Sequence, residues 1–278
     1  MIIKVCPGIG DNIWLLMKLW QCGQQFDWRI QDGQPRRGLP LFDMAPHLVK
    51  SAEYEKIPGG YKTLLVNNAE KRYKLWRNIT KPEIYLSANQ HLEAGKRIEK
   101  FLPDLPTTFR IPWELGEYED LYPLKGKWIG IYGSSYSTAR AWGFWNADGW
   151  AKLVKLVHDY NPEYQFVLIG ADFDMDMNSG LSELLAKDGV QHLNITGMSL
   201  QGTAAIIKQL HYFFAFPSGL PILAHTMGIP LTMFYPPHLK LMMNTWARPE
   251  DIESGHYKGC QFCDPETIFD WAVKNNKI

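Results

Sequence analysis

Short apolar runs alternate with amphipathic stretches along most of the chain. Residues 2–5 (IIKV) predict a buried strand, and DNIWLLMKLWQCG, from residue 11, predicts a helix that stops at Gly23. Strands that alternate with helices favour a parallel sheet, and hence an α/β fold. Further strands are expected over 27–33, 62–68 and 83–89, and a helix over 91–102.

The same alternation starts again near residue 127 and continues to the end of the chain. Between the two arrays, residues 111–127 have no clear period and include Pro, Gly and four acids, as is typical of a linker. Strands are expected over 127–135, 164–172, 190–197, 212–219 and 230–237, and helices over 146–160, 179–189, 200–210, 220–228 and 264–276. Two doubly wound domains are predicted, 1–118 and 119–262, with 263–278 as a closing helix that packs back on the first domain.

Composition narrows the functional classes. The 278 residues include 29 basic and 29 acidic side chains, so no net field draws the protein to nucleic acid or to an anionic membrane. No apolar run is long enough for a transmembrane segment, and the N-terminus lacks the pattern of a signal peptide. Four cysteines in a chain of this length do not form the disulfide framework that is typical of small secreted proteins. We therefore expect a cytoplasmic protein.

One basic patch stands out against the neutral total. The stretch KRYKLWRNITK, residues 71–81, contains five basic residues, Tyr73 and Trp76, and no acid. It is either a solvated face or a surface for an acceptor that carries phosphates, such as a lipopolysaccharide core or DNA. Lys74 and Arg77 are its candidate acceptor-binding residues.

The sequence PGIGDN follows the first predicted strand. Gly8 and Gly10 permit a tight turn, and Asp11 then stands where the helix is expected to begin. Asp11 is either the N-cap of that helix or a functional carboxylate at the carboxyl end of a strand, where open α/β sheets bind ligands. The glycines do not spell GxGxxG, which weighs against a dinucleotide-dependent oxidoreductase.

Three loops in the second half have candidate donor-binding residues. Ser218 and Gly219 open a helix after a strand, so they either cap it or form an anion site suited to phosphate. The loop that begins with Ser134 and Ser135 leads to Arg140. Its guanidinium either binds a diphosphate or lies in a solvated loop and stacks on Trp142. Asp172 and Asp174 follow another strand and either bind ribose hydroxyls or cap a helix.

His256, Cys260 and Cys263 form an incomplete metal-ligand set. A single CxxC with one nearby histidine lacks the second pair that a structural zinc site needs. We therefore predict no metal site, and keep these three residues as its weak candidates.

From Trp128 to Pro236 the order of motifs resembles glycosyltransferase family nine, the ADP-heptose:lipopolysaccharide heptosyltransferases and their relatives. The matching stretches are GSSYSTARAWGFWNADGWAKL, VLIGADFD, LNITGMSL and PSGLPILAHTMGIPLTMFYPP, together with GIGDNIWLLMKL near the N-terminus. Two positions depart from the family pattern. Pro217 replaces an Asp before Ser-Gly, and Ile222 replaces a His three residues after that Gly.

The resemblance implies a GT-B fold, with two Rossmann-like domains that face a cleft, and an inverting transfer without metal or cofactor. It implies that Asp11 is the general base, that Arg140 and Ser218-Gly219 hold the diphosphate, and that Asp174 holds the ribose. The donor is then a nucleotide-diphosphate sugar. The full set of candidates is Ser134, Ser135, Arg140, Asp174, Gly197, Met198, Ser218 and Gly219 for the donor, and Asn12, Lys74, Arg77 and His91 for the acceptor.

The sequence thus predicts an inverting glycosyltransferase that acts on a saccharide or lipopolysaccharide-type acceptor. Two alternatives stay open. One is a phage-type enzyme of the same fold that glycosylates DNA bases, which rests on the basic patch. The other is a non-catalytic nucleotide-sugar-binding protein, which rests on Pro217 and Ile222.

Overall fold

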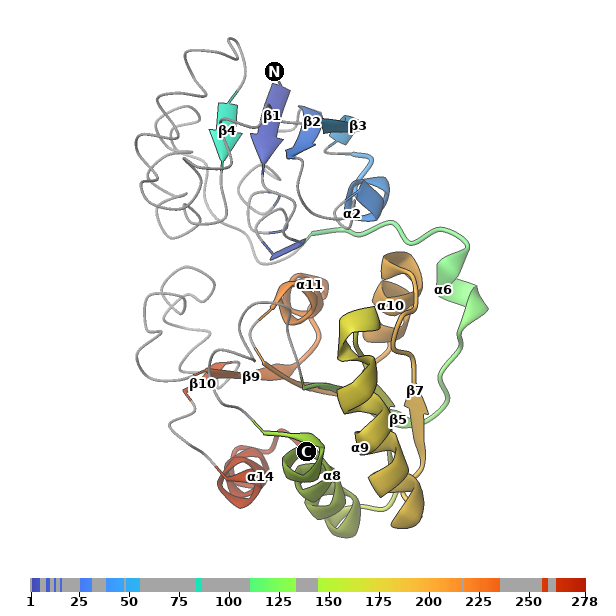
Figure 1. Ribbon diagram of the computed structural model, residues 1–278, viewed down its shortest axis with the longest axis vertical. Helices are drawn as coiled ribbons and strands as arrows, with labels where there is room; N and C mark the ends of the chain where they lie inside the picture. The colour runs from blue at the N-terminus through green and yellow to red at the C-terminus, as the bar shows by residue number, and fades with distance from the viewer. Residues whose placement is uncertain are drawn as a thin grey trace. The chain divides into compact units, whose positions relative to one another are not determined.

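The chain forms two compact units, residues 1–116 and 117–278 (Figure 1). The predicted boundary, after residue 118, lies close to this division. A computed structural model describes residues 2–5, 9–10, 13, 16, 26–31, 39–47, 49–55, 84–86, 111–133, 145–216, 218–235, 257–259 and 264–278.

The N-terminal unit contains a parallel sheet with the strand order β3-β2-β1-β4. Its described elements are β1 (Ile2–Val5), β2 (Phe26–Gln31), α2 (Leu39–Asp43), β3 (Val49–Glu55) and β4 (Ile84–Leu86). Ile13 and Leu16 are fully buried and three residues apart, as expected for one face of a helix. Ile9 and Gly10 are already helical, two residues before the predicted start at residue 11.

The C-terminal unit contains a six-stranded parallel sheet with the order β10-β9-β8-β5-β6-β7. Its strands are β5 (Lys127–Tyr132), β6 (Tyr164–Leu168), β7 (His192–Asn194), β8 (Tyr212–Ala215), β9 (Leu231–Tyr235) and β10 (Tyr257–Gly259). Its helices are α6 (Tyr118–Leu121), α8 (Ala147–Tyr160), α9 (Met175–Lys187), α10 (Leu200–Ile207), α11 (Gly219–Met227) and α14 (Pro265–Lys274), with a 3₁₀ turn, η3 (Asp172–Asp174), before α9.

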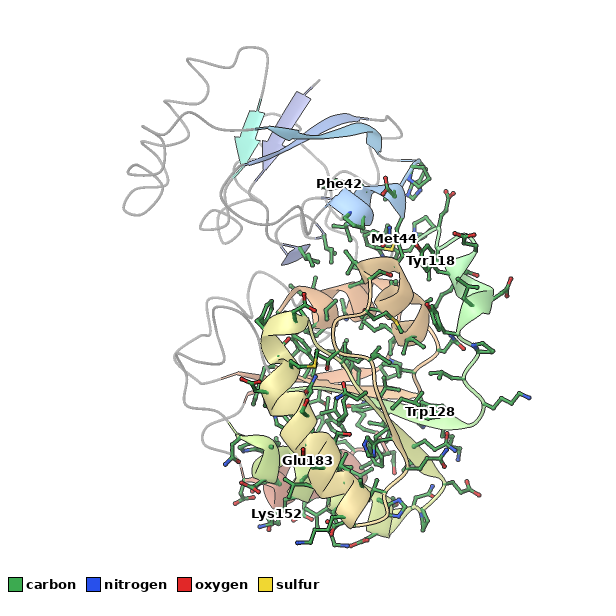
Figure 2. All side chains as sticks on the ribbon, turned by 45° about the vertical axis from the view of Figure 1, so that its right-hand side comes forward. Phe42, Met44, Tyr118, Trp128, Lys152 and Glu183 are labelled. Atoms are coloured by element: carbon green, nitrogen blue, oxygen red, sulfur yellow. The ribbon has the colours of Figure 1, made fainter. Side chains whose placement is uncertain are left out.

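Helices cover both faces of this sheet. Successive side chains along each strand point to opposite faces, so the sheet contributes to two separate cores. In β5, Ile129 and Ile131 face the core with α8, α9 and α14, whereas Trp128 and Tyr132 face the core with α10 and α11. Figure 1 shows these helix groups on opposite sides of the strands, and Figure 2 labels Trp128. Burial on both faces explains why the strands read as continuous apolar runs in the sequence.

The structure confirms most predicted elements that fall on described residues. β1, β2 and β4 match predicted strands, and all five strands and five helices predicted after residue 127 are present. β3 and β10 were not predicted, because their mixed polar sequences VKSAEYE and YKG lack an apolar run. The short helices α2 and α6 were not predicted either. The strand predicted over 62–68 and the helix over 91–102 lie outside the described residues.

The closing helix, α14, packs within the C-terminal unit. Its buried residues Ile268 and Ala272 belong to the core of α8 and α9, and Lys152 of α8 pairs with Glu266 (Lys152 is labelled in Figure 2). Its expected packing on the N-terminal domain stays a prediction. Within the described ranges, none of the helices combines the length and apolar character needed to span a bilayer.

Candidate functional site

The order in which strands are added reverses at the centre of the six-stranded parallel sheet, between β5 and β8. From β5 the sheet extends through β6 to β7, and the chain then returns to add β8, β9 and β10 on the other side of β5. In open α/β sheets, ligands bind outside the carboxyl ends of the strands at such a reversal. The candidate site therefore comprises the carboxyl ends of β5 and β8, with the neighbouring ends of β6 and β7.

Ser218 connects the two strands at the reversal. Its hydroxyl donates a hydrogen bond to Oη of Tyr132, the last residue of β5, at 3.1 Å, and the Phe216 amide donates to the Tyr132 carbonyl at 3.0 Å. Ser218 is the N-cap of α11 by its backbone, but its side chain accepts no capping hydrogen bond. The hydroxyl is therefore turned toward β5 and does not cap the helix, and its role at an anion site stays a prediction.

The start of α11 suits an anion. The first turn contains no acidic residue, and the first bond along the helix runs from the Ile222 amide to the Ser218 carbonyl at 3.4 Å. The amides of Gly219 and Leu220 precede that bond, so no helix carbonyl lies one turn before them. The N-terminal end of a helix has a partial positive charge, which favours phosphate or another anion there.

Ile222 and His225 both lie inside α11. Ile222 is 2% exposed and His225 6% exposed, so the residue that stands where family nine has its histidine belongs to the core. Pro217, the other departure from the family pattern, lies outside the described residues.

Gly133 directly follows β5 and is closely packed by side chains of two helices. A Cβ atom at this position would lie 2.5 Å from Nε1 of Trp150 and 2.6 Å from Cε of Met177. Only glycine fits this contact without displacing α8 or α9. Ser134, Ser135 and Arg140, the predicted donor ligands of the loop that follows, lie outside the described residues.

The end of β6 has two carboxylates in different environments. Asp174 is 1% exposed, and its Oδ2 accepts a hydrogen bond from the Ala171 amide at 2.9 Å. Asp172 is exposed. Its Oδ1 lies against the backbone of Gly197, because a Cβ built there would be 2.8 Å away. Asp174 thus shapes its own turn, whereas Asp172, the other carboxylate that the sequence offered for ribose hydroxyls, faces solvent.

Gly197 and Met198 stand beside this turn, at the end of β7. Gly197 has φ +84°, a conformation that favours glycine, and its amide donates to the Gly170 carbonyl at 3.0 Å. Met198 is partly buried against the core of α10 and α11. The predicted donor residues Asp174, Gly197 and Met198 therefore meet at one edge of the sheet.

The carboxyl edge has two ends of different charge character. Asp172, Asp174 and Asp176 gather after β6, whereas the start of α11 after β8 is free of acids. β6 and β8 flank β5, so these ends are two strand spacings apart, about 10 Å. Such an edge can accept hydrogen bonds from hydroxyl groups at one end and bind an anion at the other.

The remaining candidates fall on residues that the structure does not describe. The general-base candidate Asp11 is one, and its described neighbours are Gly10 and Ile13. The others are Asn12, Lys74, Arg77 and His91 for the acceptor, and His256, Cys260 and Cys263 for a metal. Their roles stay predictions.

Solved structures share this architecture over nearly the whole chain. A family 9 glycosyl transferase from Veillonella parvula has a TM-score of 0.65 and 13% identity, covering 99% of this chain and 96% of its own. The ADP-heptose lps heptosyltransferase II of E. coli also has a TM-score of 0.65, with 16% identity and coverage of 99% and 98%. The fold is GT-B.

The GT-B fold confirms the architecture that the motifs implied. A candidate UDP-N-acetylglucosamine 2-epimerase of Listeria monocytogenes also matches, with a TM-score of 0.56, 11% identity and coverage of 100% and 88%. No protein-family model and no curated protein matches the chain in sequence. Since GT-B proteins of different activities match this chain, its function must be argued from the site.

Proposed function

We propose that this protein is an inverting glycosyltransferase that moves a sugar from a nucleotide-diphosphate donor to an acceptor hydroxyl. The observation that carries the proposal is the acid-free start of α11, which Ser218 links to the end of β5 at the reversal of the sheet. A departing nucleoside diphosphate gains negative charge as its bond to the sugar breaks. Helix amides fixed at that position stabilise this charge.

In this proposal the donor lies along the carboxyl edge of the C-terminal unit. The diphosphate takes the start of α11, with Ser218, Gly219 and Arg140 as its ligands, and Ser134 and Ser135 contribute from the loop after β5. The ribose takes the acidic end after β6, where we add the exposed Asp172 to the predicted Asp174. Gly197 and Met198 flank the nucleobase of the donor.

Asp11 is the proposed general base. Its carboxylate takes the proton of the acceptor hydroxyl, whose oxygen attacks the anomeric carbon from the face opposite the diphosphate. The carbon–oxygen bond to the diphosphate breaks, the nucleoside diphosphate leaves with the electron pair, and the anomeric configuration inverts. The transition state resembles an oxocarbenium ion, as in glycoside hydrolysis. Arg140 and the helix amides supply the positive charge, so the proposed reaction requires no metal ion.

A neighbour of the same fold and the basic patch support the proposed donor and acceptor classes. One E. coli protein with this fold is named an ADP-heptose lps heptosyltransferase, so we propose an ADP-activated heptose or related sugar as donor. We propose a saccharide acceptor with phosphates, bound by Asn12, Lys74, Arg77 and His91. The same patch supports DNA as the alternative acceptor.

Two experiments in sequence test the proposal. Calorimetry with ADP, UDP, GDP and NADH identifies the nucleotide class, and we expect a nucleoside diphosphate to bind and NADH not to. Incubation with the matching nucleotide sugar and a lipopolysaccharide core acceptor should then release nucleoside diphosphate and yield a glycosylated acceptor. The anomeric configuration of the transferred sugar should be opposite to that in the donor. Binding without turnover on any saccharide or DNA acceptor would favour the non-catalytic alternative, and absence of nucleotide binding would reject the proposal.

A further inference from the structure

Asn178 is a fully buried polar residue on α9 beneath the ends of β6 and β7. It is 0% exposed and shares the inward face of the helix with Leu181 and Leu185. Its side-chain amide donates to the Ile169 carbonyl at 3.2 Å and to Oγ1 of Thr196 at 2.7 Å. One side chain thus binds the segment after β6 and the segment after β7.

The hydrogen bonds continue from Thr196. Its hydroxyl donates to Oδ1 of Asn194 at 2.6 Å, and its amide donates to the same oxygen at 3.1 Å. Next to it, the Gly197 amide donates to the Gly170 carbonyl at 3.0 Å. The two loops are therefore joined twice, through the Asn178 side chain and through their own backbones.

Gly170 makes room for this arrangement. A Cβ atom there would lie 2.7 Å from Nδ2 of Asn178 and 2.8 Å from Cβ of Asp174. The bare backbone of Gly170 lets both side chains pack directly beneath the loop. Asp174 in turn accepts the Ala171 amide, so the turn that presents Asp172 rests on Asn178 and Asp174.

Asn178 places a polar group on an otherwise apolar helix face. Among the residues that the structure describes, its buried Oδ1 has no hydrogen-bond partner, and a buried acceptor without a partner is unfavourable. A leucine of similar size would continue the apolar face of α9 without that penalty. Features that cost stability are found where function requires them, and the groups that Asn178 holds in place are the exposed Asp172 and Gly197.

We infer that Asn178 is a positioning residue that locks the two loops after β6 and β7, and thereby sets the affinity for the ribose end of a nucleoside diphosphate. The inference rests on the proposed function for the identity of the ligand. Asn178 itself touches no ligand because it is buried. It acts through the backbone of residues 169–172 and 196–197.

The test compares Asn178→Leu with Tyr212→Phe as the matched control. Tyr212 is buried in the same core and shares a hydrogen bond of 2.6 Å with Thr232, but it begins β8, at the opposite end of the strand from the site. Both variants remove a buried hydrogen bond from the same unit. Two properties are measured: amide hydrogen exchange at Ala171 and Gly197, and the dissociation constant of the nucleoside diphosphate that the wild type binds.

We expect Asn178→Leu to speed exchange at both amides at least tenfold and to weaken nucleotide binding at least tenfold, while Tyr212→Phe leaves both within about twofold of wild type. Unchanged exchange or unchanged affinity in folded Asn178→Leu would overturn the inference. Thr196→Val breaks the same connection at a partly exposed residue, so it replaces Asn178→Leu if that variant does not fold. If the wild type binds no nucleotide but exchange still accelerates, the positioning role stands and the proposed function fails.

Discussion

The hydroxyl of Ser218 donates to the phenolic oxygen of Tyr132 across 3.1 Å, and thus joins the start of α11 to the end of β5, 86 positions earlier in the chain. The bond spans the reversal of the sheet, where a GT-B protein places its donor in our proposal. It fixes the orientation of the hydroxyl and leaves the helix amides to the ligand. Both residues therefore become points at which the proposal can be tested.

Ser218→Ala should weaken nucleoside diphosphate binding about three- to tenfold, roughly 0.7–1.4 kcal/mol, because the hydrogen bond that fixes the start of α11 against β5 is lost together with the hydroxyl itself. Isothermal titration calorimetry measures the change. Tyr132→Phe keeps the Ser218 hydroxyl and removes only its acceptor, so a smaller loss is expected. Equal affinity in all three proteins would show that Ser218 has no part in binding.

Arg140→Ala should weaken the same binding at least tenfold, about 1.4 kcal/mol, since charge-assisted hydrogen bonds to phosphate exceed neutral ones in strength. Lys155→Ala is the control, because it removes a positive charge from the surface of α8, where Lys155 pairs with Asp159. An affinity for Arg140→Ala that matches the control would remove Arg140 from the donor site.

Asp11→Asn separates a general base from a structural residue. Asn caps a helix about as well as Asp but takes up no proton at neutral pH. We expect nucleotide binding and the melting temperature to stay close to wild type, and turnover to fall roughly 10²-fold or more. The measurement is steady-state kinetics with the acceptor that the turnover experiment identifies. Full turnover in the folded variant would refute the catalytic role.

Gly133→Ala should destabilise the C-terminal unit by about 1–3 kcal/mol, because the added methyl would overlap Trp150 and Met177. Chemical denaturation followed by tryptophan fluorescence measures the loss. Gly189→Ala is a useful comparison. No described atom lies within 4 Å of a Cβ built there, and its φ of +71° isolates the backbone cost from the steric one. A Gly133→Ala protein as stable as wild type would mean that α8 and α9 can move apart there.

The start of α14 should make stability depend on pH in the acidic range. The hydrogen bond from the Thr267 amide lowers the pKa of Asp264, and Lys152 lowers the pKa of Glu266, from ordinary values of 3.8 and 4.5. The unfolded chain then binds more protons, so this stabilisation is present above the ordinary values and is lost as the pH falls from them through the lowered pKa values of the folded protein.

Urea unfolding between about pH 6 and about pH 3 measures this dependence. Asp264→Asn keeps the helix cap but cannot titrate, so its stability should fall less steeply with decreasing pH than that of wild type. An identical slope in the two proteins would contradict the assignment to Asp264.

The amino-acid sequence by itself determined most of the elements of the C-terminal unit and their order along the chain. Strands buried on both faces leave continuous apolar runs such as KWIGIY and YFFA, and amphipathic helices leave Trp150, Leu153, Val154 and Val157 on one face. Local signals of this kind depend only on neighbouring residues. β3 and β10 escaped prediction because their polar residues leave no such run.

Only the tertiary structure decided which residues meet at the candidate site. Ser218 and Tyr132, or Asn178 and Thr196, become partners because parallel strands bring their carboxyl ends to one edge, and no local pattern records that pairing. It likewise separated Asp172, which faces solvent, from Asp174, whose carboxylate is buried in its own turn, although the two are nearly adjacent in the sequence. Burial depends on packing between distant segments, which is the physical reason that residue type and spacing could name the carboxylates but not assign their roles.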